Sequence, residues 1–172
     1  YLAILMNYHC AKSMVIHENG IYRSVKYTKE VENNNMPNEV FKFYKIWNSS
    51  IGQYVEYDEM KQMNHDLLEL ESYVHITSPI RRLIDMLNMI QLMKDLNMFM
   101  FGNNCEKFCI GWIQRLDYIN STMKAIRKVQ NDCQMLDMCS NKEVVEREYY
   151  GYIFNKVLRS DNINQYIIYI SD

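Results

Sequence analysis

The sequence predicts an α+β fold that is largely helical up to about residue 140 and β-rich after it. Three observations predict this fold: long stretches with apolar residues at helical spacing, short stretches of extended character, and a change to aromatic and β-branched residues after the polar turn at 140–142. The expected helices span residues 2–17, 39–47, 79–98 and 105–138, and the expected strands span residues 20–23, 67–76, 149–157 and 165–170.

The first part of the chain is expected to alternate between helix and strand. Apolar residues fill positions 2–17, and Asn19 with Gly20 supplies the turn signal that ends this helix. Residues 20–23 have an extended pattern, and the polar segment 30–38 is rich in turn formers, which indicates a loop. Residues 39–47 return to helical spacing, and their apolar side includes Val40, Phe43, Tyr44 and Trp47.

Residues 79–98 are apolar almost all round, which is typical of a helix buried in a larger domain. Thr77 and Ser78 before Pro79 favour a helix start here, because a hydroxyl can cap free N–H groups and Pro fits the first helical position. A narrow polar stripe at helical spacing is expected to face water or a ligand. It comprises Arg81, Asp85, Asn88 and Asp95.

This helix start would place Arg81 and Arg82 in the first turn, where the helix dipole disfavours each positive charge by about 0.3–1 kcal/mol. Two explanations are open. Asp85 has the spacing to pair with either arginine, but an exposed helical ion pair contributes only about 0.3–0.5 kcal/mol. Alternatively, a phosphate binds the free N–H groups at the helix start with an arginine fork beside them, which makes the two charges favourable.

The second half of the chain is expected to contain a long helix and then a hairpin. Residues 102–104 (GNN) break the chain, and residues 105–138 return to helical character. The segments 149–157 and 165–170 are aromatic and β-branched, and the polar residues 159–162 separate them. This pattern predicts a β-hairpin that opens a β domain.

Composition narrows the classes of function. With a net charge of −2 the chain has no global basic field, so any binding of a polyanion must be local. Five cysteines without secretory features favour reduced thiols, and we expect an intracellular, cytoplasmic protein. No charge-free apolar run approaches the roughly 20 residues that span a bilayer, so no membrane partner is expected. The chain begins at Tyr1 and ends inside an expected strand, which predicts a piece of a longer protein.

The run HITSPIRRLID at residues 75–85, with Tyr73 just before it, resembles the signature of the RNB-domain exoribonucleases, which include ribonuclease II, ribonuclease R and the catalytic subunit of the exosome. Residues 7–11 and the segment GIYR at 20–23 are similar to neighbouring family segments. The resemblance covers nearly the whole chain. It implies that residues 1–140 are the C-terminal, largely helical half of an RNB catalytic domain, and that residues 146–172 are the opening strands of an OB-type β-barrel.

The resemblance implies processive 3′→5′ hydrolysis of single-stranded RNA to nucleoside monophosphates, with Mg²⁺ as cofactor. Arg81 would be the catalytic residue, in contact with the scissile phosphate. The family's Asp cluster for Mg²⁺ is expected upstream of this chain, so we expect no metal ligands here and no activity of these residues alone. No DNA partner is expected. The residues that would bind RNA or phosphate are Ser78, Arg81, Arg82, Tyr73 and His75.

Two positions depart from the family pattern. Leu67 and Leu83 stand where the family has Gly and Tyr. An alternative is therefore a catalytically inactive RNB-like protein that binds RNA or serves as an assembly scaffold. The presence or absence of the upstream Asp cluster would separate the two.

Overall fold

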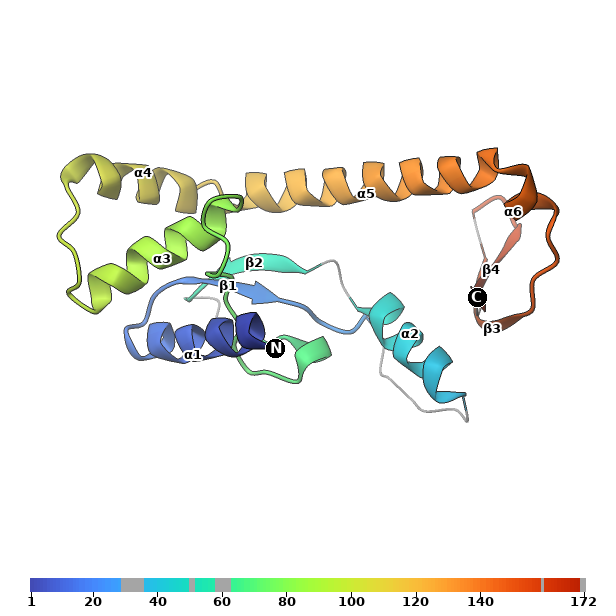
Figure 1. The fold of residues 1–172 in the computed structure, drawn as a ribbon, viewed down its shortest axis with the longest axis horizontal. Helices are drawn as coiled ribbons and strands as arrows, with labels where there is room; N and C mark the ends of the chain where they lie inside the picture. The colour runs from blue at the N-terminus through green and yellow to red at the C-terminus, as the bar shows by residue number, and fades with distance from the viewer. Residues whose placement is uncertain (29–35, 50–51, 58–62, 159, 171–172) are drawn as a thin grey trace. The chain divides into compact units, whose positions relative to one another are not determined.

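A computed structural model describes residues 1–28, 36–49, 52–57, 63–158 and 160–170 (Figure 1). The chain divides into two compact units, Tyr1–Thr28 with Ser49–Lys124, and Lys29–Asn48 with Ala125–Asp172. The first unit contains α1 (Leu2–Ile16), β1 (Ile21–Ser24), β2 (Gln53–Glu56), the short 3₁₀ helix η2 (Asp66–Leu68), α3 (Leu83–Asp95), α4 (Asn103–Ile113) and the start of α5 (Leu116–Ser140). The second contains α2 (Asn38–Asn48), the rest of α5, α6 (Lys142–Glu146), β3 (Gly151–Leu158) and β4 (Asn164–Ile170).

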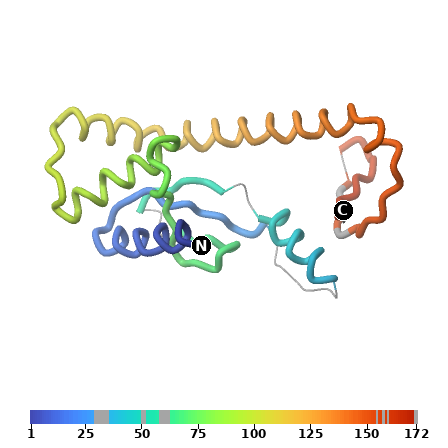
Figure 2. Tube along the Cα trace, viewed as in Figure 1, coloured from blue at the N-terminus to red at the C-terminus, as the bar shows by residue number. Residues whose placement is uncertain are grey.

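The centre of the first unit is a small antiparallel sheet covered on both faces. β1 pairs with β2, and Tyr22 lies opposite Val55 while Arg23 lies opposite Tyr54. Because side chains alternate along a strand, Tyr22 and Val55 share one face. That face packs against α1 in a core that includes Cys10, Ala11, Met14, Val74 and Ile76. Figure 2 shows the path of α1 beside β1.

The opposite face of the sheet packs against the helices that follow the sheet in the chain. Ile21 and Tyr54 lie there, in a core with Ile84, Leu87 and Leu116 from α3 and α5. β1 is therefore buried on both sides along its whole length, whereas β2 is buried at Tyr54 and Val55 and exposed at its two ends.

Asn120 ties the start of α5 to β2. Its side-chain carbonyl accepts the Tyr54 N–H at 2.8 Å, and its amide group donates to the Tyr54 carbonyl at 2.9 Å. One side chain thus satisfies both backbone groups at the free edge of β2, where no further strand pairs among the described residues.

The strand expected at residues 67–76 is wrong. Residues 66–68 form η2, Glu69 follows in the left-handed conformation with φ 55°, and only Val74 bridges to β1, opposite Tyr22. Local backbone bonds close this segment on itself, because the His65 carbonyl accepts the N–H groups of Leu68 at 3.0 Å and Leu70 at 3.3 Å. These N–H groups are therefore not available to a sheet ladder.

The helix expected from Pro79 begins instead at Leu83, so Arg81 and Arg82 do not lie in its first turn. Arg82 occupies the N-cap position with extended dihedral angles, and Asp85 is the acidic residue of the first turn. The placement of charge thus suits the helix dipole after all. At the other end the helix stops at Asp95, and Asn97 adopts a left-handed conformation with φ 53°.

Two further expectations about the helices need correction. The region 105–138 is two helices, α4 and α5, separated at residues 114–115. The polar stripe of α3 does not face water at its centre, because Asp85 and Asn88 are 0% and 1% exposed. Both side chains bond to backbone groups of neighbouring segments, which is why a buried helix tolerates them.

The other expected elements are confirmed, with bounds shifted by a few residues. They are α1, β1, α2 and the hairpin of β3 and β4, whose ladder shifts register between Ile153 and Asn155. Within the second unit, the Phe43 ring of α2 lies 5.3 Å from the Tyr169 ring of β4. The OB-type barrel and the boundary between residues 140 and 146 stay predictions, and the loop expected at 30–38 lies mostly outside the described residues.

Each of the five cysteines is a free thiol. In the part of the chain that the structure describes, no helix has both the length and the apolar character needed to cross a membrane.

Candidate functional site

A turn at residues 78–82, which we name the arginine turn, precedes α3. The Ser78 carbonyl accepts the N–H groups of Arg81 at 3.2 Å and Arg82 at 3.1 Å, which closes the turn. The Arg81 side chain is exposed and Ser78 is half-buried. The turn thus holds Arg81 out toward solvent at the start of a buried helix.

The two arginines of the turn differ in their partners. Arg82 donates from Nη2 to Asp85 Oδ1 at 2.8 Å, with its side chain 34% exposed and Asp85 fully buried. The same Asp85 oxygen accepts the Ser78 N–H at 2.8 Å. The ion pair foreseen for Asp85 therefore forms with Arg82, and the charge of Arg81 is left available for a ligand.

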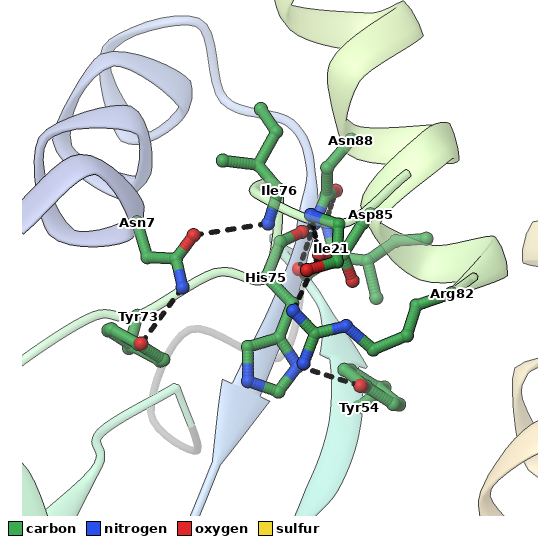
Figure 3. A network of polar contacts seen from close by, with 10 residues as sticks. Asn7, Ile21, Tyr54, Tyr73, His75, Ile76, Arg82, Asp85 and Asn88 are labelled. Atoms are coloured by element: carbon green, nitrogen blue, oxygen red, sulfur yellow. Dashed lines mark hydrogen bonds and ion pairs between the residues drawn. The ribbon is translucent and has the colours of Figure 1, made fainter. Parts of the chain in front are cut away.

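His75 lies behind the turn, beside the Arg82 guanidinium (Figure 3). Its Nδ1 is 2.8 Å from the Tyr54 hydroxyl. The pKa of His75 is lowered to about 4, mainly by burial and then by the nearby charges of Arg82 and Arg23, which Asp85 opposes. The ring is therefore neutral at pH 7, and it adds no positive charge beside the two guanidinium groups.

Tyr73 occupies a deeper position and is 6% exposed. Its hydroxyl accepts an N–H of the Asn7 amide at 2.9 Å, and the Asn7 carbonyl accepts the Ile76 N–H at 3.2 Å (Figure 3). The Tyr73 ring contacts both His75 and His65 edge-on, at 5.7 and 5.2 Å. These contacts anchor the segment that leads into the arginine turn.

Asn88 fixes the same segment from the side of α3. Its carbonyl accepts the Ile21 N–H at 2.9 Å, and its amide donates to the carbonyls of Ile21 at 2.8 Å and His75 at 3.0 Å (Figure 3). One buried side chain thus joins α3, β1 and the segment of His75. The arginine turn follows His75 by three residues, so this connection also holds the turn near the sheet.

Arg23, Tyr54 and Asn7 belong to this site, although the sequence analysis did not assign them to it. The Arg23 guanidinium lies 5.0 Å from the centre of the Tyr54 ring, opposite it on the sheet, and is 8% exposed. Gly52 leaves room for it, because a Cβ there would lie 2.6 Å from the guanidinium. The GIYR segment was a usable signal for Arg23, whereas the partner strand of Tyr54 shows no such motif.

The five residues expected to bind RNA therefore lie along one short segment. Ser78 and Arg81 are accessible, Arg82 is engaged by Asp85, and Tyr73 and His75 lie behind them. Within the described residues, no group of three or more His, Cys, Asp or Glu side chains could hold a metal ion. The described residues therefore do not by themselves fit a magnesium centre.

An exposed arginine fork and a hydroxyl on a turn backed by neutral rings suit the binding of a phosphate-bearing ligand. The RNB domain model matches residues 5–97, which is more than half of the chain, from α1 through the arginine turn to the end of α3. The chain therefore belongs to the RNB domain family, whose members are generally hydrolytic, RNA-degrading exoribonucleases and typically depend on divalent metal ions. It matches no curated protein and no solved structure.

Proposed function

We propose that the protein carrying this chain is a 3′→5′ exoribonuclease that hydrolyses single-stranded RNA processively to nucleoside monophosphates. Its Arg81 binds the scissile phosphate and stabilises the charge that develops there. Membership of the RNB domain family supports the reaction class. The further assignment of Arg81 rests on the geometry of the arginine turn.

The observation that carries this assignment is the difference between the two arginines. Arg82 is held by a buried carboxylate at 2.8 Å, so its charge is already compensated. Arg81 is exposed on the same turn. A phosphate that approaches the turn therefore meets one uncompensated guanidinium, which offers two parallel N–H donors to its oxygens.

The other predicted residues take two roles in this proposal. Ser78 contacts the RNA backbone through its hydroxyl, since the residue is only partly buried and belongs to the same turn as Arg81. Arg82, His75 and Tyr73 support the site from behind, because Asp85 engages the first and the ring contacts bury much of the other two.

In this proposal, the Mg²⁺ ion that assists hydrolysis binds to residues outside this chain. The family's Asp ligands for Mg²⁺ are expected upstream, and the described residues hold no group that fits the ion. Hydrolysis would thus require the longer protein, in which residues 146–172 begin an OB-type barrel. The free cysteines are compatible with the intracellular, cytoplasmic location that the proposal includes.

The test uses the longest natural protein that contains this chain and a 5′-labelled single-stranded RNA, with Mg²⁺ or with EDTA. A metal-dependent conversion to a very short labelled product is expected, because digestion from the 3′ end keeps the label until last. A 3′-labelled RNA should release labelled mononucleotide at once. RNA that is bound but stays intact would contradict the proposal and favour the inactive, RNA-binding scaffold.

A further inference from the structure

Asp85 has an unusual pattern of hydrogen bonds for a buried carboxylate. The residue is 0% exposed, and its Oδ1 accepts two bonds at 2.8 Å, one from the Ser78 N–H and one from Arg82 Nη2. Its Oδ2 and the Arg82 Nε are both buried without a hydrogen-bond partner among the described residues. A buried, partly unsatisfied carboxylate costs desolvation free energy, which an apolar side chain at the same position would not lose. Packing alone therefore does not explain an aspartate here.

The two bonds of Asp85 span the whole arginine turn. One reaches Ser78, where the turn begins, and the other reaches the side chain of Arg82, where it ends. The backbone bonds to the Ser78 carbonyl close the turn internally, but Asp85 is the side chain that attaches it to α3. Asp85 itself is fully buried in the first turn of α3.

From this geometry we infer that Asp85 is a positioning residue for Arg81. The inference rests on the proposed function. By attaching Ser78 and Arg82 to α3, the carboxylate fixes the backbone that carries Arg81 between them. By compensating the charge of Arg82, it also leaves Arg81 as the arginine of the turn that meets the phosphate.

A positioning role for Asp85 predicts a different effect on the reaction rate than a role in stabilising the fold alone. A stabilising residue acts on the whole protein, so the effect of its loss multiplies with the effect of losing Arg81. A positioning residue acts through Arg81, so its loss has little further effect once the Arg81 side chain is gone. A double-mutant cycle distinguishes these two cases.

The first measurement is amide hydrogen exchange of Ser78, Arg81 and Arg82 in the full protein and in its Asp85→Ala variant. Faster exchange at Ser78 is expected, because its N–H loses the acceptor oxygen. If Asp85→Ala does not fold, Asp85→Asn takes its place and should give a smaller increase, since a neutral acceptor is weaker. Unchanged exchange would overturn the inference whether or not the protein cleaves RNA.

The second measurement is the single-turnover rate of RNA hydrolysis for Asp85→Asn, Arg81→Ala and the double variant. Asp85→Asn alone should slow the reaction by about tenfold to a hundredfold, as a misplaced catalytic group does. In the Arg81→Ala background it should cost less than about threefold. Asn19→Ala serves as the structural control, because its amide donates to Asp95 at the far end of α3, and its effect should multiply with that of Arg81→Ala.

The outcomes separate the inference from the function on which it rests. If the wild-type protein leaves RNA intact while the turn loosens in Asp85→Ala, the proposed nuclease is wrong and the positioning of the turn stands. If the wild type cleaves RNA but the effects of Asp85→Asn and Arg81→Ala multiply fully, Asp85 is structural and the inference is overturned.

Discussion

At the scale of single residues, the candidate site depends on asparagine side chains that bond to backbone groups. Asn88 satisfies three backbone groups on two different segments, and Asn7 and Asn120 each satisfy backbone groups on one. An apolar side chain at such a position would leave these groups unpaired in the interior, which costs more than a lost hydrogen bond in water. Asn88 and Asn7 therefore hold the segment that leads into the arginine turn, and Asn120 holds β2.

The substitution Asn88→Ala should lower the free energy of unfolding by about 2–4 kcal/mol, because it strands the N–H and carbonyl of Ile21 and the carbonyl of His75. Urea denaturation followed by far-UV circular dichroism measures this. Asn104→Ala on the exposed side of α4 is the matched control and should change stability by less than about 0.5 kcal/mol. Equal effects of the two substitutions would contradict the role of Asn88.

The His75 ring predicts a pH dependence of stability. Its pKa is lowered to about 4 in the folded protein, mainly by burial, against about 6.5 in the unfolded chain. As the pH falls from about 6.5 to 4, the unfolded state takes up a proton that the folded ring does not, so stability falls in this range. Above about pH 6.5 both states are neutral and His75 contributes no slope.

Urea midpoints at pH 7, 5.5 and 4.5 test this for the wild type and for His75→Gln, which keeps a polar group beside Tyr54. The variant should lose less stability on acidification. Some slope should remain in the variant, because burial also lowers the pKa of His65. An identical loss in both proteins would show that His75 is not the group that titrates.

At the scale of elements, the sequence predicted which segments are helical more reliably than where they start. Apolar periodicity identified α1, α2 and α3, because burial of one or more faces imposes it. The start of α3 was wrong by four residues, since Ser78 and Pro79 also suit a turn that precedes the helix and is attached to it by Asp85. The spacing of Asp85 to the arginines is visible in the sequence, but it does not distinguish the first turn of a helix from such a turn.

The contact between α5 and β2 depends on the side chain of Asn120. Asn120→Ala should speed amide exchange at Tyr54, because the Tyr54 N–H donates to the Asn120 side chain at 2.8 Å. Ser121→Ala is the control, since its hydroxyl bonds only within α5, to the Tyr118 carbonyl. If Tyr54 exchanges at the same rate in both variants, Asn120 does not hold the edge of β2.

For the whole molecule, the sequence alone located the segment of the candidate site, but the contacts among its residues could not be predicted. The TSPIRR run identified the segment of Ser78, Arg81 and Arg82, because that motif is long and specific. Nothing in the sequence alone indicated that Asp85 binds Arg82 in preference to Arg81, or that Arg23 and Tyr54 face each other across the sheet. These depend on how α3 and the two strands pack together.

At this scale, the net charge of −2 limits how the protein can bind RNA. Without a global basic field, binding of RNA must depend on a few local cations. Removal of the exposed Arg81 should therefore affect the reaction far more than removal of an exposed arginine elsewhere on the chain.

The most direct test of the account is the single-turnover rate of RNA hydrolysis by the full protein with Arg81→Ala, beside Arg127→Ala on the exposed surface of α5. The account predicts a loss of about 100- to 1,000-fold for Arg81→Ala, as for other donors that stabilise developing charge, and a rate close to wild type for Arg127→Ala. Arg81→Lys should fall between them, since it keeps the charge and loses the fork. An Arg81→Ala variant that cleaves RNA at the wild-type rate would contradict the central claim.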